Sequence, residues 1–151
     1  MKMTCFPLET KSDIYIMTQF ANFTINDGKA TPVAHTFSTK SNDGRVTVWE
    51  DRSSGVPIGY PKVTLRTADD AKLRRIDIGL TVPTLEAVSG SNQSGFTPAA
   101  TLAYYHDLQV KVKLPTRGTL AERVDLYALG CNLLAHAVFG GVIKTGEEIS
   151  G

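Results

Sequence analysis

The sequence has little of what small secreted, metal-binding or membrane-spanning proteins require. Its 151 residues include only two cysteines, Cys5 and Cys131, too few for a disulfide framework or a four-ligand zinc site. No apolar run approaches the roughly 20 residues of a membrane-spanning helix. The first residues contain no continuous apolar segment of the kind found in secretory signal peptides. We therefore expect neither a secreted protein nor an integral membrane protein.

The sequence also lacks the spacings that mark common catalytic and metal centres. His35, His106 and His136 show no spacing typical of a metal site. Cys131 lies among leucines, where a small buried apolar residue is expected rather than a nucleophile. An enzyme with its active site around His106 and Asp107 is only a remote hypothesis. We expect no catalytic residue, no metal and no cofactor.

What is present is typical of one globular domain, with 42% apolar and 21% charged residues. The net charge of +1 hides a gradient along the chain. Residues 60–117 contain eight basic and five acidic side chains, whereas the residues after Arg117 contain two basic and four acidic ones. Such a difference in charge along the chain more often reflects charged side chains in contact with solvent than a binding site for an anionic partner.

Alternation of apolar and polar residues predicts an antiparallel sheet, most clearly over residues 101–114. There Leu108, Val110, Val112 and Leu114 alternate with Asp107, Gln109, Lys111 and Lys113. Five earlier strands are expected at residues 20–25, 31–38, 45–51, 62–67 and 73–82. Asp27-Gly28 is expected to supply the positive φ of a tight first hairpin.

Three connections separate the later strands. Residues 42–44, Asn-Asp-Gly, predict a turn, and residues 52–61 predict a loop rich in Ser, Gly and Pro. The polar segment between Pro83 and Thr101 has no phosphate-binding spacing, so a flexible hairpin loop is the better interpretation.

From Thr119 the periodicity becomes helical, and Thr119 with Glu122 forms a capping-box pattern. The apolar stripe is wide enough to need cover on more than one side; it contains Leu120, Val124, Tyr127, Cys131 and Leu134. Gly140-Gly141 is expected to break the helix, with one or two further turns over residues 142–149. The prediction is an α+β fold: an amino-terminal β-hairpin, an antiparallel multi-stranded sheet, a helix and a short second helix.

Residues 1–16 show no clean periodicity and precede a second methionine, Met17. We expect them to be an extension, either outside the native protein or loosely ordered. Residues 17–151 then form the single domain.

The order of these features resembles that of the coat proteins of single-stranded RNA bacteriophages, the levivirus type. Short stretches are similar too: Thr18-Gln19-Phe20, Val48-Trp49, Tyr60 with Lys62-Val63-Thr64, Leu80-Thr81-Val82-Pro83, and Leu114-Pro115. The resemblance covers about residues 17–143. The first 16 residues and an insertion around residues 52–59 depart from it.

The resemblance implies an intertwined homodimer in which each subunit's helix crosses onto the partner's sheet. The implied dimer-interface residues are Leu120, Val124, Tyr127, Cys131 and Leu134. Dimers would assemble into an icosahedral shell of the T=3 type, with residues 87–100 clustering at symmetry axes. The implied location is the virion, assembled in the cytoplasm of a bacterial host, with no membrane partner.

The resemblance also implies that the sheet face opposite the helices binds single-stranded genomic RNA, and a hairpin that represses translation. The implied RNA-binding residues are Lys62, Thr64, Arg66, Arg75, Asp77, Gln109, Lys111 and Lys113. Asp77 and Gly79 stand where the resemblance implies side chains more favourable for binding a hairpin. We therefore expect packaging of RNA by charge rather than recognition of one particular hairpin. The alternative function is a non-viral dimeric nucleic-acid-binding module that uses the same basic face.

Overall fold

The computed structural model describes residues 20–87 and 99–148. They belong to two compact units, a sheet unit within residues 17–113 and a helical unit that begins at residue 114. The expected extension, residues 1–16, and most of the expected symmetry-axis loop lie outside the described residues.

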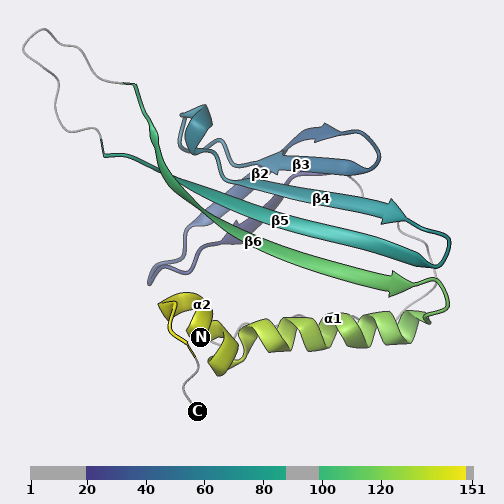
Figure 1. Ribbon diagram of the computed structural model, residues 1–151. Coiled ribbons are helices and arrows are strands. Elements are labelled where there is room, and N and C mark those ends of the chain that lie inside the picture. The colour runs from purple at the N-terminus through teal and green to yellow at the C-terminus, as the bar shows by residue number, and fades with distance from the viewer. Residues whose placement is uncertain (1–19, 88–98, 149–151) are drawn as a thin grey trace, which may run out of the picture. The chain divides into compact units, whose positions relative to one another are not determined.

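Six strands form one sheet in which neighbours in sequence are also neighbours in space (Figure 1). The strands are β1 Phe23–Asn26, β2 Ala34–Asn42, β3 Val46–Glu50, β4 Lys62–Asp69, β5 Leu73–Leu85 and β6 Leu102–Pro115. A 3-10 helix, η1 Pro57–Gly59, lies in the β3–β4 connection. This sequential order confirms the predicted sheet and needs only hairpin connections.

The connection between β1 and β2 differs from the predicted tight turn. Asn26 pairs with Ala34, so residues 27–33 form a longer loop. Asp27 closes this loop, because its N–H donates to the Val33 carbonyl at 3.0 Å and its Oδ1 accepts from the Val33 N–H at 2.9 Å. Gly28 does not have the positive φ that a tight turn would need, so that prediction was wrong. The predicted turn at residues 42–44 is confirmed, with Gly44 at φ 84°.

Aromatic side chains form the best-packed part of the sheet unit. Phe23 stacks on Phe37 with ring centroids 5.3 Å apart and meets Trp49 edge-on at 5.6 Å. Phe20 lies 5.5 Å from Trp49, whose indole N–H donates to the Ala21 carbonyl at 3.0 Å. Phe37 is only 2% exposed. The rings therefore hold the amino-terminal hairpin on β3.

Two helices follow the sheet: α1 Leu120–Ala135 and α2 Ala137–Thr145, bent by 54° relative to each other. The predicted capping box is confirmed at the start of α1. The Thr119 N–H donates to the Glu122 carboxylate at 2.7 Å, and the Glu122 N–H donates to the Thr119 hydroxyl at 3.3 Å. With these helices in place, the predicted α+β class is confirmed.

The break between the helices is at His136, so the prediction that Gly140-Gly141 breaks the helix was wrong. His136 has an extended backbone, with ψ 141°, and its side chain accepts a hydrogen bond from the Val138 N–H at 3.3 Å. It therefore ends α1 and caps α2. Gly140 and Gly141 lie inside α2, because a helical glycine costs only about 1 kcal/mol relative to alanine.

Candidate nucleic-acid interface

The register between β4 and β5 gathers polar side chains on one side of the sheet, here called the polar face. Residues directly opposite each other in a ladder point to the same side. Three such pairs lie on the polar face: Lys62 with Thr81, Thr64 with Gly79, and Arg66 with Asp77. The predicted alternation of β4 is therefore confirmed.

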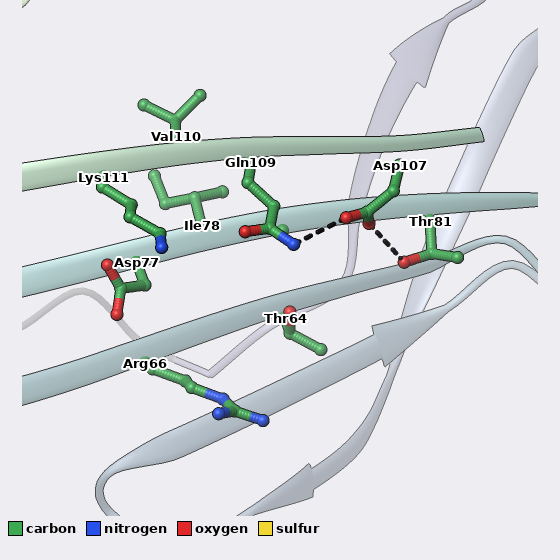
Figure 2. Close-up of a pocket in the computed structure, with 10 residues that line it drawn as sticks. Thr64, Arg66, Asp77, Ile78, Thr81, Asp107, Gln109, Val110 and Lys111 are labelled. Atoms are coloured by element: carbon green, nitrogen blue, oxygen red, sulfur yellow. Dashed lines mark hydrogen bonds between the residues drawn. The ribbon is translucent and has the colours of Figure 1, made fainter.

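Strand β6 extends the polar face. The Thr81 hydroxyl donates to Asp107 Oδ1 at 2.9 Å, which places Asp107 on the same side. Alternation along the strand adds Gln109 and Lys111. Figure 2 shows these three β6 side chains pointing toward β5 and β4, whereas Val110 points away.

A shallow pocket of about 320 Å³ lies on the polar face between β4, β5 and β6 (Figure 2). It is lined by Thr64, Arg66, Asp77, Ile78, Gly79, Thr81, Asp107, Gln109, Val110 and Lys111. Gly79 keeps its floor open: a Cβ there would lie 2.8 Å from the Thr64 hydroxyl oxygen, closer than real side chains allow. A mid-strand glycine commonly marks such a close approach.

A second pocket of about 390 Å³ lies beside the first. It is lined by Arg75, Asp77, Lys111, Val112 and Lys113. Asp77 and Lys111 line both pockets, so the two pockets are neighbours on the polar face. Every predicted RNA-binding residue except Lys62 lines one of them, and Lys62 shares the polar face through its register with Thr81.

The polar face holds cations without carboxylate partners. Within residues 20–87 and 99–148, the side chains of Lys62, Arg66, Lys111 and Lys113 form no ion pair, whereas Arg75 contacts Asp70 at 2.6 Å. Asp77 and Asp107 are the opposing carboxylates. Unpaired cations beside open pockets provide a site for a phosphate-bearing ligand.

Sequence reasoning left Thr81 and Asp107 out of the predicted set. Each is two residues from a polar-face residue, Gly79 or Gln109, so the period-two alternation of a strand was the available signal. Val46 and Val48 also lie on the polar face, opposite Arg66 and Thr64. Their placement depends on the β3–β4 register, which the alternation within β3 does not determine.

A buried carboxylate lies at the edge of the polar face. Glu50, opposite Lys62, is 5% exposed. It accepts hydrogen bonds from Lys40 Nζ and Arg52 Nε, both at 2.8 Å. The Lys40 hydrogen bond is the main cause of a pKa of Glu50 below its ordinary value. Lys40 lies in a β-bulge between Thr39 and Ser41, a feature that no pattern in the sequence indicates.

A second charged cluster joins the amino-terminal hairpin to the end of β3. His35 Nδ1 lies 2.7 Å from Asp51 Oδ2, and His35 Nε2 lies 3.5 Å from Asp27 Oδ2. The hydrogen bond to Asp51 raises the pKa of His35. Burial by itself would raise the pKa of Asp51, but hydrogen bonds from His35 and the Ser53 backbone hold it below its ordinary value.

The enzyme hypothesis gains no geometric support. His106 and Asp107 are consecutive in β6, so their side chains point to opposite sides of the sheet. The His106 ring meets Tyr104 edge-on at 5.5 Å, whereas Asp107 bonds Thr81. Among the described residues no group of three His, Cys, Asp or Glu side chains could hold a metal ion.

The apolar stripe of α1 is uncovered in a single copy of the chain. No residue of this helix, all of which is described, is buried. Four of the predicted dimer-interface residues are exposed: Leu120 at 68%, Val124 at 43%, Tyr127 at 66% and Leu134 at 47%. Cys131 is half-buried. Most of the predicted stripe is thus exposed to solvent in a single copy.

Neither described helix could cross a membrane by itself. Taken together, α1 and α2 have the length and apolar composition for a bent span, by those two criteria alone.

Comparison with solved structures found phage capsid proteins. The chain is 27% identical to the protein of the virus-like particle of bacteriophage ESE058, with a TM-score of 0.80, covering 87% of this chain and 99% of that one. For the virus-like particle of bacteriophage NT-214 the identity is 23% and the TM-score 0.76, over 87% and 99%. An unassembled, RNA-binding bacteriophage coat protein dimer gives 16% identity and a TM-score of 0.61, over 87% and 98%.

Comparison with curated proteins found no match. The family model of the Levivirus coat proteins matches residues 18–149, a range that includes every described residue. Six strands in sequential order followed by two helices agree with the phage coat protein structures above. The chain therefore belongs to the Levivirus coat protein family.

Proposed function

We propose that this coat protein pairs with a second copy of itself, that the pairs assemble into an icosahedral shell, and that the polar face binds the enclosed single-stranded RNA. The observation that supports RNA binding is the set of unpaired cations beside the two pockets, Lys62, Arg66, Lys111 and Lys113. Lysine and arginine side chains neutralise backbone phosphates without regard to base sequence. The RNA-binding residues are those predicted: Lys62, Thr64, Arg66, Arg75, Asp77, Gln109, Lys111 and Lys113.

Pairing of two copies is supported by the exposed stripe of α1. A contiguous apolar surface of this kind marks an interaction site, and burying one such side chain contributes about 1.5–3 kcal/mol. A twofold arrangement would let the same stripe be covered on both copies. The interface residues are Leu120, Val124, Tyr127, Cys131 and Leu134.

Relatives support the assembly proposed here. Solved structures similar to this chain come from virus-like particles and from an unassembled coat protein dimer described as RNA-binding. The shell would form in the cytoplasm of a bacterial host and become the capsid of the virion. Asp77 on the polar face makes packaging by charge better supported than recognition of one particular hairpin.

Expression of the full-length chain without other phage proteins tests the proposed assembly. Electron microscopy is expected to show uniform spherical particles, and extraction is expected to recover host RNA from them. Discrete dimers that bind nucleic acid without forming particles would instead favour a dimeric binding module and contradict the shell.

Charge reversal on β6 tests the polar face. The double variant Lys111→Glu, Lys113→Glu is expected to lower the RNA content per protein, measured from the ratio of absorbance at 260 and 280 nm, because two phosphate contacts become repulsive. Lys144→Glu, a reversal in the last turn of α2, is the control. RNA content equal to wild type in the double variant would overturn the assignment of this face.

A further inference from the structure

Lys62 lies directly opposite a carboxylate and yet forms no ion pair with it. Its partner in the β3–β4 ladder is Glu50, and its partner in the β4–β5 ladder is the neutral Thr81. Directly opposed residues have Cβ atoms about 4.5–5.5 Å apart, and opposite charges in such positions attract each other. Lys62 is nevertheless exposed and makes no ion pair within the part of the chain that the structure describes.

The reason is that both oxygens of the Glu50 carboxylate already have a cationic partner. Lys40 Nζ donates to Oε2 and Arg52 Nε donates to Oε1, each at 2.8 Å. The Lys40 hydrogen bond is the main cause of the lowered pKa of Glu50, so the carboxylate is ionised at neutral pH. Because Glu50 is buried, an oxygen that lost its partner would have little access to water. Lys62 therefore faces a carboxylate that two other cations occupy.

The β-bulge in β2 places Lys40 at this carboxylate. Between Thr39 and Ser41 the register advances by two residues in β2 but by one in β3, so Lys40 is the extra residue of the bulge. A bulge re-aims the side chain of its extra residue. Arg52 comes two residues after Glu50 in the chain and reaches the other oxygen.

We propose that Lys40 and Arg52 are positioning residues, which occupy the Glu50 carboxylate and thereby leave Lys62 free to contact a phosphate of RNA. The inference rests on the proposed RNA binding by the polar face. If Lys40 loses its charge, Oε2 of Glu50 loses its partner, and Lys62 lies directly opposite to replace it. A lysine paired with a carboxylate no longer offers a free positive charge to a phosphate.

The salt dependence of RNA binding tests this proposal, because it reports the number of phosphate contacts. Each contact with a single strand adds about 0.7 to the magnitude of the slope of log affinity against log salt concentration. Fluorescence anisotropy of a labelled oligouridylate gives the affinity of the full-length protein, freed of nucleic acid, at several NaCl concentrations. Lys62→Gln is expected to lower the slope by about 0.7. Lys40→Met is expected to lower it by the same amount, because Lys62 then pairs with Glu50.

Double variants distinguish this effect from a direct phosphate contact of Lys40. Lys40→Met combined with Lys62→Gln is expected to lower the slope no further than either change alone, because both remove the same contact. Glu50→Gln in the Lys40→Met background is expected to restore the wild-type slope, because the neutral amide does not hold Lys62 in an ion pair. Additive losses of about 1.4 in the first double variant, or a slope that stays low in the second, would overturn the proposal.

Further variants test the same carboxylate from its other side. Arg52→Met removes the partner of Oε1 and is expected to lower the slope as Lys40→Met does. Lys40→Arg keeps a cation on Glu50 and is expected to retain the wild-type slope. Lys144→Met, in the last turn of α2, is the matched control for the loss of one lysine charge and should also retain it. An unchanged slope in both Lys40→Met and Arg52→Met would contradict the positioning role.

Two other variants separate failure of this proposal from failure of RNA binding by the polar face. If Lys62→Gln and the double variant Lys111→Glu, Lys113→Glu both lower the slope but Lys40→Met does not, the polar face binds RNA and only the role of Lys40 is wrong. If neither lowers the slope, the polar face does not bind RNA, and this proposal is overturned with it.

Discussion

His35 joins two parts of the sheet unit through two carboxylates. Asp27 lies in the β1–β2 connection and Asp51 follows β3, and the imidazole lies within 3.5 Å of one and 2.7 Å of the other. Asp51 is only 2% exposed, so its charge depends on the hydrogen bonds around it. A protonated His35 is charged and has an N–H facing each carboxylate, whereas a neutral imidazole has a single N–H.

This geometry predicts a pH dependence of stability. The pKa of His35 is raised above its unfolded value of about 6.5, so its contribution is complete below that pH and is lost as pH rises through the raised pKa. The pKa values of Asp27 and Asp51 are lowered, so their contribution is present above about pH 4 and is lost on further acidification. The cluster is therefore expected to stabilise the fold most between about pH 4 and 6.5.

Replacing the imidazole tests this pH dependence. In His35→Gln the free energy of unfolding, measured by denaturant titration at one protein concentration, is expected to fall less than in wild type between pH 6 and 9. His106→Gln, at an exposed histidine of β6, should keep the wild-type profile. Parallel profiles for wild type and His35→Gln would show that the cluster does not titrate in this range.

At the scale of the element, local sequence patterns predicted the start of α1 but not its end. The capping box begins α1 where the sequence predicted, because Thr119 and Glu122 satisfy each other's backbone N–H groups without help from the rest of the fold. The end of α1 was predicted wrongly. Glycines were expected to break the helix, but His136 left helical geometry and capped α2 instead.

Removing the cap is expected to destabilise the protein. Thr119→Ala leaves the Glu122 N–H without its partner and should lower the free energy of unfolding by about 1 kcal/mol. Thr31→Ala, in the β1–β2 connection, is the control and should change it by less than about 0.5 kcal/mol. Thermal or denaturant unfolding measures both, and equal stability of the two variants would contradict the role of the cap.

At the scale of the whole molecule, few apolar side chains among the described residues are buried in a single copy of the chain. Phe37 is the one buried apolar side chain among the described residues, and large apolar side chains of β6, α1 and α2 are exposed. A folded chain normally buries most such side chains, so the exposed ones mark surface that another copy can cover. This is the physical basis for the proposed pairing.

A charge placed in the α1 stripe tests the pairing. Val124→Lys is expected to abolish particle formation, because burying an ammonium group at an apolar interface costs far more than the valine contributed. Asn132→Lys, an exposed polar position of the same helix, is the charge-matched control and should still assemble. Sedimentation velocity with electron microscopy distinguishes the outcomes, and normal particles from Val124→Lys would place the interface elsewhere.

The sequence by itself determined the order of the strands and helices, the alternation along β4, β5 and β6, and the start of α1. These features depend on residues close together in the chain. Only the tertiary structure decided the longer β1–β2 loop, the β-bulge at Lys40, the break at His136, and the hydrogen bonds that occupy Glu50. Each of these depends on register or on contacts between strands, so a residue's own neighbours in sequence do not specify them. The alternation showed that Lys62 faces solvent, and the hydrogen bonds of Lys40 and Arg52 to Glu50 decided that Lys62 is left without an ion pair among the described residues.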